Sequence, residues 1–318
     1  MTFHARIACT LSVIAVFTPA FSFGAAHASN ILFISTTGKN SNACTLAAPC
    51  RTLQRAISLT PSGGEIRILD SGFFGKTATI RKPLTISGNG QTVHLGSPIV
   101  IDEADAVVTL RGLTLNGRGA DHSGINVNAA AVVRIERCVV RGFASNGIQS
   151  VAGGAEMLVT DSISRDNTDN GIFVDQAAGL TVDNSRFENN GAAGVIVRNT
   201  NTAISRSIAA GNGGQGIAAV PASISIRATL AVQNGNEGFV ATSGSVMTVD
   251  ASLAHGNGNG LRVINGARAL ISNSTFTGNR IGIDNGSGFR FIETLQNNTV
   301  RGNLTDIAGG PPVPVGGL

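Results

Sequence analysis

The sequence predicts an all-β solenoid of stacked parallel strands, and composition is the first of three observations behind that prediction. Of the 318 residues, 41 are Gly and 27 are Asn, which suits a chain with many tight turns. Gly costs about 1 kcal/mol relative to Ala inside a helix, so a helical protein is disfavoured. Apolar residues make up 42% and charged residues 13%, which is enough apolar surface for a core and argues against disorder.

An internal repeat of 22 to 24 residues is the second observation. Gly followed by a bulky apolar residue recurs at this interval along most of the chain. Periods of this length are typical of solenoids and related arrays. The pairs are Gly124-Ile125, Gly147-Ile148, Gly171-Ile172, Gly194-Val195, Gly216-Ile217, Gly238-Phe239, Gly260-Leu261 and Gly282-Ile283.

Three further series of residues keep the phase of this repeat. One is Asn, one is a small or polar residue five positions earlier, and one is an apolar residue three positions before that. Because Cys138 falls in the second of them, we expect it to be a buried structural residue. The series are Asn167, Asn190, Asn212, Asn234, Asn257, Asn279 and Asn303; Cys138, Ser162, Ser185, Ser207, Thr229, Ser252, Ser274 and Asn298; and Ile135, Val159, Val182, Ile204, Ile226, Val249, Ile271 and Leu295.

Alternation of apolar and polar residues within one repeat is the third observation. The segment from Gly171 to Asp175 alternates like a half-buried strand. A repeat of about 22 residues, at roughly 3.3 Å each, makes one coil of about three short strands. The repeats lack the several Leu and the helical segment of leucine-rich repeats. We therefore predict a single-stranded parallel β-helix of about ten coils, with stacked apolar columns, Asn side chains bonded between coils, and Gly supplying positive φ at the corners.

These coils resemble those of the right-handed parallel β-helix proteins of the pectin-lyase-like superfamily. The resemblance covers residues 64–307 and rests on segments such as Ile271–Asn279 and on the step from Asn170 to Val174. It implies a right-handed solenoid. It does not select one function, because the superfamily contains polysaccharide lyases, hydrolases and epimerases as well as proteins without known activity.

The two ends of the chain differ from the repeats. Residues 1–28 resemble a signal peptide, with an apolar run after Arg6 and the small-x-small site Ala26-His27-Ala28, so we expect a secreted or periplasmic protein. In such a compartment Cys44 and Cys50 would form a disulfide. It would pin an N-terminal cap, residues 29–63, that contains a short helix at 50–59 with Leu53, Ala56 and Ile57 on one face. The β-helix would span 64–308, and the Pro/Gly-rich residues 309–318 would form a flexible tail.

Charge and hydropathy limit the possible partners. Without Arg6 the chain has 22 basic and 19 acidic residues, a net charge of about +3 that is too small and scattered to indicate nucleic acid. No segment after the signal peptide is long and apolar enough to span a membrane. The remaining partners are an extracellular polysaccharide or a protein. A protein could bind the apolar side chains expected on the exposed face of the Gly-Ile strands: Val151, Phe173, Ile196, Val220, Val240 and Ile264.

Candidate catalytic residues are few. On the exposed face of the Gly-Ile strands, only Asp175 and Asp284 are acidic, and each has an Arg in a neighbouring coil, Arg198 and Arg262 respectively. Both pairs are interpreted first as surface ion pairs, which contribute about 0–1 kcal/mol each. As a catalytic site, Asp175 with Arg198 is the strongest candidate.

A second acidic group lies in the turns before and after the same coil. Asp166, Asp169 and Glu188 could meet on one side of the solenoid, where they could bind Ca²⁺ or sugar hydroxyls. A solvated charged loop is the favoured interpretation. We predict no cofactor, and Ca²⁺ only if the protein is a lyase. The two most distinctive His residues, His122 and His255, are about six coils apart and cannot share one centre.

Two hypotheses of function remain. The first is an exported, non-catalytic binding or structural module at the cell surface or in the periplasm, with a possible relation to glycans. The second is a polysaccharide-active enzyme, a lyase or an epimerase, with an atypical Asp/Arg site. The absence of Trp and Tyr favours the first, because those side chains commonly grip sugar rings.

Overall fold

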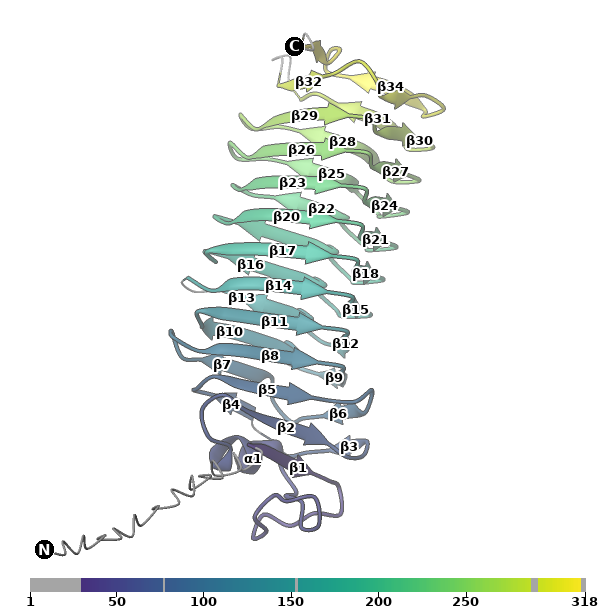
Figure 1. Ribbon diagram of the computed structural model, residues 1–318. Coiled ribbons are helices and arrows are strands. Elements are labelled where there is room, and N and C mark those ends of the chain that lie inside the picture. Colours follow the sequence, from purple (N-terminus) through teal and green to yellow (C-terminus); the bar gives the residue numbers. More distant parts are fainter. Residues whose placement is uncertain (1–29, 77, 152–153, 287–290, 316–318) are drawn as a thin grey trace, which may run out of the picture.

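The computed structural model describes residues 30–76, 78–151, 154–286 and 291–315. The predicted signal peptide lies outside these residues. Within them the chain winds into one elongated solenoid whose coils stack from the N-terminal to the C-terminal end (Figure 1). Consecutive strands belong to three different sheets, and every strand pairs in parallel with its counterpart one coil away.

The three sheets are named A, B and C. Sheet A contains β1 (Ile31–Ile34), β2 (Gly64–Ile68), β5 (Leu84–Ser87), β8 (Val107–Arg111), β11 (Val132–Glu136), β14 (Glu156–Thr160), β17 (Gly179–Asp183), β20 (Asn201–Ser205), β23 (Ser223–Arg227), β26 (Val246–Asp250), β29 (Arg268–Ser272), β32 (Ile292–Thr294) and β35 (Val313–Pro314). Sheet B contains β3 (Gly72–Phe73), β6 (Thr92–His94), β9 (Thr114–Ala120), β12 (Val139–Phe143), β15 (Ile163–Arg165), β18 (Arg186–Glu188), β21 (Ile208–Ala210), β24 (Leu230–Val232), β27 (Leu253–His255), β30 (Thr275–Thr277) and β33 (Thr299–Val300). Sheet C contains β4 (Ala78–Ile80), β7 (Ile99–Asp102), β10 (Ile125–Ala129), β13 (Ile148–Ser150), β16 (Ile172–Asp175), β19 (Val195–Arg198), β22 (Ile217–Ala219), β25 (Glu237–Ala241), β28 (Asn259–Val263), β31 (Ile281–Asp284) and β34 (Thr305–Ala308).

The apolar series of the sequence forms a continuous buried column in sheet A. Ile135 pairs with Val159, and the column continues in register through Val249 to Ile271. Its predicted last member is wrong. Ile271 pairs with Thr294, while Leu295 is 42% exposed. The cause is an extra residue in that coil, because a shift of one position turns a strand residue to the opposite face of its sheet.

The Asn series forms an amide ladder at the corner between sheets B and C, as predicted. It comprises seven residues: Asn167, Asn190, Asn212, Asn234, Asn257, Asn279 and Asn303. Each amide Nδ2 donates to the Oδ1 of the next, at 2.9 to 3.1 Å. Each Oδ1 from Asn190 onward also accepts from the backbone N–H of the preceding member. The last amide, Asn303, donates to the Asp306 carboxylate.

The second polar series lines the corner between sheets A and B. The hydroxyl of Ser185 accepts from the backbone N–H of Ser162, and the same bond recurs between other neighbours in the series. The residue directly before each member from Cys138 to Ser274 has a positive φ, and none of these residues is Gly: Arg137, Asp161, Asn184, Arg206, Ala228, Ala251 and Asn273. Cys138 is buried in this series as expected, and burial raises the pKa of its thiol to about 11.

Glycines at several corners, such as Gly211, Gly256 and Gly278, have the predicted positive φ, but the strand-opening glycines serve a different purpose. Gly216 and Gly238 do not have positive φ. A Cβ on Gly216 would lie 2.6 Å from the carbonyl oxygen of Gly238 and 2.9 Å from the amide nitrogen of Asn234. Gly is therefore required here because the next coil approaches closely, and not because the corner needs a left-handed residue.

The N-terminal end of the solenoid is covered by α1 (Leu53–Leu59), as Figure 1 shows. The helix buries Leu53, Ala56 and Ile57, which is the predicted face. It begins later than the predicted residue 50 because Thr52 is its N-cap and accepts from the N–H of Arg55.

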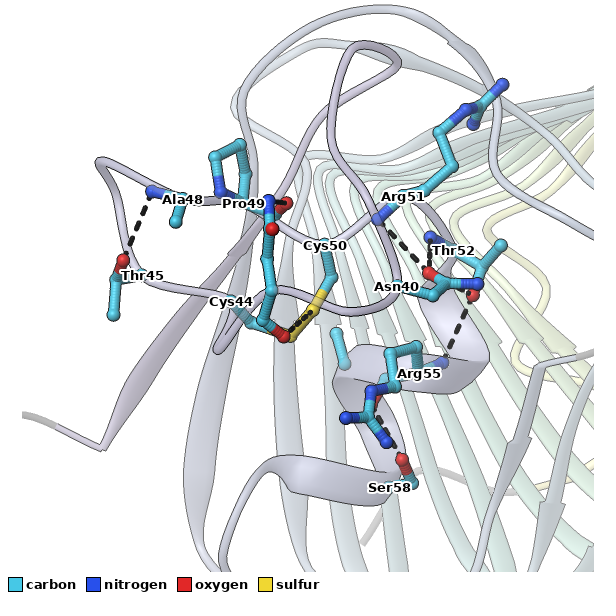
Figure 2. The surroundings of a disulfide bond; sticks show 12 residues. Asn40, Cys44, Thr45, Ala48, Pro49, Cys50, Arg51, Thr52, Arg55 and Ser58 are labelled. Atoms are coloured by element: carbon cyan, nitrogen blue, oxygen red, sulfur yellow. Dashed lines mark hydrogen bonds between the residues drawn. A yellow bond between two sulfur atoms is a disulfide. The ribbon is translucent and has the colours of Figure 1, made fainter.

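The predicted disulfide between Cys44 and Cys50 is present, and both residues are fully buried (Figure 2). Next to it, the side-chain oxygen of Asn40 accepts from the backbone N–H groups of Arg51 and Thr52. These contacts attach the loop to the start of α1. A disulfide of this kind fits an exported protein.

At the C-terminal end, the predicted tail contributes a strand. Residues Val313–Pro314 form β35, which pairs with β32. The flexibility of residues 309–318 stays a prediction. Across the part of the chain that the structure describes, no helix has the length and apolar character needed to cross a membrane.

Candidate functional site on the outer face of sheet C

The outward-facing side chains of sheet C form one row along the solenoid axis. Strand register aligns a single residue from each coil in this row. Such neighbours are about 4.8 Å apart. The row is polar at both ends and apolar in the middle: Asn126, Gln149, Phe173, Ile196, Ala218, Val240, Arg262 and Asp284.

The middle of this row is apolar and partly covered. Ala218 is 3% exposed and Val240 is 6% exposed, yet neither packs into the core cluster, which instead contains their inward-facing neighbours Ile217 and Phe239. Phe173 and Ile196 are half-buried. We call the four apolar residues Phe173, Ile196, Ala218 and Val240 the sheet C recess.

A polar pocket of about 260 Å³ lies at the C-terminal end of the recess. We call it the corner pocket. Its centre is Arg262, whose Nη1 lies 3.2 Å from Glu237 Oε1 and whose Nε lies 3.0 Å from Asp284 Oδ2. The Glu237 side chain is only 10% exposed and that of Asp284 18%. The pocket is lined by Gly235, Asn236, Glu237, Gly258, Asn259, Arg262, Arg280 and Asp284.

Three groups in the corner pocket have unused hydrogen-bonding capacity. Asn259 is 5% exposed, and its Oδ1 has no hydrogen-bond partner among the described residues, although its Nδ2 donates to Asp284. Arg262 Nε lies close to Asp284 but makes no hydrogen bond with any described residue. Arg280 is exposed, and no hydrogen bond or ion pair of its guanidinium is found in the described part of the chain. A buried acceptor without a donor costs free energy. Because Asn259 Oδ1 is itself buried, a ligand would have to displace its neighbours to reach it.

The acidic and amide residues at this corner belong to a second polar row, directly before the strand-opening glycines. We call it the pre-glycine row: Asn146, Asn170, Ala193, Gln215, Glu237 and Asn259. Its contacts change from coil to coil. Asn170 Nδ2 donates to Asn146 Oδ1 at 2.8 Å, and Gln215 Nε2 donates to Glu237 Oε2 at 3.2 Å. Ala193 has no side-chain polar group, so the row is interrupted.

Known proteins match this architecture. A family model described as "Right handed beta helix region" matches residues 97–254. The A-module of the Azotobacter vinelandii mannuronan C-5 epimerase AlgE4 is similar in structure, with a TM-score of 0.64, 18% identity and coverage of 80% of this chain and 91% of that one. The A-module of AlgE6 from the same organism gives 0.60 and 20%, covering 83% and 93%. The pectate lyase Pel9A gives 0.51 and 13%, covering 85% and 72%. No curated protein matches the sequence.

The chain is a right-handed parallel β-helix protein with the pectin-lyase-like fold. The identities to the solved structures are too low to carry more than the fold. The site therefore has to be argued from the residues of this β-helix protein itself.

Asp175 and Arg198 occupy neighbouring positions on this face, as the repeat predicts. The expected ion pair between them is wrong. Asp175 Oδ1 accepts from Asn199 Nδ2 at 2.9 Å, and the Arg198 guanidinium lies over the ring of Phe173, 5.2 Å from its centroid. Arg198 is drawn to the aromatic ring, where a cation–π contact is available. The second expected pair, Arg262 with Asp284, is present at 3.0 Å.

The predicted acidic group near the same coil is occupied by its own Arg residues. Asp166 has a positive φ and pairs with Arg165 at 2.7 Å. Glu188 lies at the end of a strand, not in a turn, and accepts from Arg186 Nε at 2.7 Å. Asp169 is exposed in the turn before β16. Among the described residues, no three His, Cys, Asp or Glu side chains form a group that could hold a metal ion. The roles of these three residues stay predictions.

Sequence reasoning missed Glu237, Asn259 and Arg280. It examined the second and fourth residues after each Gly, whereas these three precede the Gly of their coil by one or two positions. The signal that could have found them is a charge in the pre-glycine row. Glu237 is the single carboxylate in a row otherwise made of amides and one Ala.

A larger hollow of about 520 Å³ lies on sheet A, over β14 to β26. Its floor contains small side chains such as Gly179, Ala203 and Ser225, and Glu156 is the one charged residue in its lining. Because the side chains that line it are short and mostly uncharged, it offers less recognition chemistry than the corner pocket.

Proposed function

We propose that this protein is an exported, non-catalytic glycan-binding module whose ligand lies along the outer face of sheet C. The single observation that carries the proposal is the row of apolar side chains that continues in register from Val240 to Arg262, which lines a polar pocket. Binding sites for small molecules and sugars combine an apolar floor with a few well-placed polar groups. The sheet C recess and the corner pocket offer this combination within neighbouring coils.

The shape of the site suits a chain more than a compact ligand. The row from Phe173 to Asp284 crosses six successive coils, which at about 4.8 Å per coil is roughly 24 Å. An extended sugar chain could place an apolar ring face on Ile196, beside the Arg198 guanidinium that lies over Phe173, and hydroxyls at the corner pocket. The similar solved structures include a mannuronan C-5 epimerase and a pectate lyase, which supports a glycan as the ligand class.

A non-catalytic role is supported by the contacts of the candidate carboxylates. Asp175, Asp166 and Glu188 each have a hydrogen-bond or ion-pair partner in the structure. A general acid or base needs a carboxylate that can reach its substrate. Export is supported by the disulfide between Cys44 and Cys50 and by the signal-like segment at residues 1–28.

Binding to a glycan array, followed by titration calorimetry on the best ligand, tests the proposal. Ile196→Ser should weaken binding about fivefold to tenfold, because it removes about 1 kcal/mol of apolar contact from the recess. Leu158→Ser is the matched control, because Leu158 is a half-buried outward-facing residue on sheet A. Equal loss in both variants, or no binding to any glycan, would contradict the proposal.

An activity assay separates this proposal from the enzyme alternative. The protein is incubated with a panel of polysaccharides, and unsaturated ends, reducing ends and epimer content are followed with and without Ca²⁺. We expect no turnover. Turnover that is abolished by Asp175→Ala would instead establish a lyase or an epimerase with Asp175 and Arg198 at its centre.

A further inference from the structure

We infer that the corner pocket takes one residue of a neutral sugar chain and discriminates against a uronate. The inference rests on the proposed glycan-binding function of sheet C and names the class of glycan. It follows from three features of the described residues: the pairing of Arg262, the acceptor positions on Glu237 and Asp284 that no described residue fills, and the balance of charge along the face.

Arg262 is already paired with two carboxylates. Its Nη1 lies 3.2 Å from Glu237 Oε1 and donates to it, and its Nε lies 3.0 Å from Asp284 Oδ2. Both carboxylates are largely buried, where screening by water is weak. A uronate carboxylate entering this pocket would therefore meet two negative groups that already share Arg262, and among the described residues Arg280 is the one cation of the lining without a partner.

The pocket presents acceptors that need donors. A carboxylate offers about four lone-pair positions. Glu237 accepts from Gln215 and Arg262. Asp284 accepts from Asn259 and from the backbone N–H of Gly286, and it forms an ion pair with Arg262. Sugar hydroxyls are donors that can fill the remaining acceptor positions on the two carboxylates, whereas an ionised uronate carboxylate has only acceptor oxygens.

The charge along the rest of the face does not attract a polyanion. Between β16 and β31, the outer face and the turn positions directly before it contain four carboxylates and three guanidiniums. A polyuronate carries one negative charge per sugar, so its binding needs an excess of cations. The carboxylates are Asp169, Asp175, Glu237 and Asp284, and the guanidiniums are Arg198, Arg262 and Arg280.

Arg280 is the group that favours the opposite conclusion, a uronate as the ligand. It is exposed at the pocket and has no partner in the described part of the chain. A neutral sugar would use it as a hydrogen-bond donor to a hydroxyl or ring oxygen, an exposed contact of modest strength. A uronate would depend on it, because it is the one cation of the pocket that is not already paired. The two ligand classes therefore predict opposite effects on affinity. A neutral sugar should lose more affinity in Glu237→Gln, and a uronate should lose more in Arg280→Gln.

The test measures binding of the full chain to neutral chains (glucan, galactan, mannan) and to polyuronates (polymannuronate, polygalacturonate). Each Kd is determined at about 20 mM and about 300 mM NaCl, which spans the range over which exposed charges become screened. Three pocket variants are compared: Glu237→Gln, Asp284→Asn and Arg280→Gln. Glu156→Gln on sheet A is the matched control. Thermal unfolding checks that each variant is folded, and Asp284→Asn replaces Glu237→Gln if the latter is not.

We expect a neutral chain to bind with a Kd that changes less than about twofold with salt. Glu237→Gln and Asp284→Asn should each weaken binding about tenfold, because a charge-assisted bond to a sugar hydroxyl becomes an ordinary one. Arg280→Gln should change the Kd by less than about threefold. The inference would be overturned, and the proposed function kept, if a polyuronate bound more tightly than the neutral chains. Its binding would then weaken with salt, be abolished by Arg280→Gln and be strengthened by Glu237→Gln. Binding to neither class would overturn the proposed function with it.

Discussion

Two polar rows run side by side along the corner between sheets B and C, and they differ in how regularly they repeat. The amide ladder repeats one residue type from Asn167 to Asn303 and bonds each side chain to the next. The pre-glycine row, two or three residues further along, varies from Asn to Ala to Glu and leaves the Oδ1 of Asn259 without a partner among the described residues. Repetition therefore marks the polar residues that bond every coil to the next, and under the proposed function variation marks those available to a ligand.

Breaking the ladder at its centre should have the largest effect on stability. In Asn234→Ala, the carbonyl of Ala209, the amides of Asn212 and the Oδ1 of Asn257 lose their buried partners. Several unsatisfied buried groups cost about 3 kcal/mol in total. Urea unfolding should show this loss, while binding by sheet C stays unchanged in the folded protein.

Asn128→Ala is the control for this experiment. Asn128 is exposed on strand β10, and no side-chain hydrogen bond of it is found among the described residues. Its replacement should change stability by less than about 0.5 kcal/mol. A loss below about 1 kcal/mol in Asn234→Ala would show that water replaces the ladder at little cost.

The end of the ladder should be less sensitive than its centre. Asp306 accepts from both the backbone N–H and the amide Nδ2 of Asn303, and it is exposed. In Asp306→Ala, water can reach the two donors, so we expect a loss of about 1 kcal/mol. Asp306→Asn keeps an acceptor and should recover most of it. Urea midpoints of the three proteins measure the difference, and an Asp306→Ala loss as large as that of Asn234→Ala would mean that the ladder is cooperative along its length.

Lowering the pH should weaken the charged contacts at the corner between sheets A and B, and it should not affect the amide hydrogen bonds of the ladder. A hydrogen bond from Ser205, together with the Arg206 guanidinium, holds the pKa of Asp183 below its ordinary value. Bonds from Asn273 and Ser272 do the same for Asp250. Because the folded-state pKa is lowered, the stabilisation is complete above the unfolded-state pKa of about 4 and is lost as the pH falls through the folded-state value.

Asp183→Asn tests this assignment. We expect the variant to be less stable than the original protein at pH 7 by under about 1 kcal/mol, since the carboxylate is partly exposed. The difference should shrink as the pH falls below about 4 and vanish once the pH is below the lowered folded-state pKa. Melting temperatures recorded from pH 7 into the acid range measure it. A difference that persists unchanged in acid would mean that the carboxylate stabilises the corner by packing and not by its charge.

The smallest expected effect on stability comes from the pre-glycine row. Asn259→Ala removes a side chain whose Oδ1 has no partner and whose only side-chain bond, to Asp284, is 3.3 Å long. The lost bond and the relieved orphan acceptor nearly cancel, so stability should change by less than about 0.5 kcal/mol. Glycan affinity should decline in the same variant. A stability loss near that of Asn234→Ala would remove the distinction between the two rows.

The fold could be predicted from the sequence because the same residue types recur at the same positions in most coils. The columns from Ile135 to Ile271, the amide ladder and the helix face of Leu53 all lie where periodicity places them. The prediction is wrong where the period changes, as at Leu295, and where one residue type has two uses. The strand-opening glycines are needed for close approach between coils, a distance that one repeat by itself does not reveal.

The candidate site was less predictable because it depends on departures from the repeat. Register placed Asp175 beside Arg198, but only side-chain geometry shows that Arg198 lies over Phe173. Glu237 was missed because it belongs to a position that is an amide in most coils. A periodic pattern predicts the average coil, and a binding site is made of the coils that differ from it.

The head-to-tail direction of the amide ladder has a consequence for how such a protein can change in length. Every side chain donates toward the C-terminus, and Asp306 receives the last donor. A whole coil, such as residues 207–228, could be deleted or duplicated without leaving a mismatched amide, because the joint reproduces the same bond. Each such change would shorten or lengthen the outer face of sheet C by about 4.8 Å. Deletion or duplication of single coils, in evolution or by design, can thus change the length of this face one coil at a time, while the two ends of the solenoid stay the same.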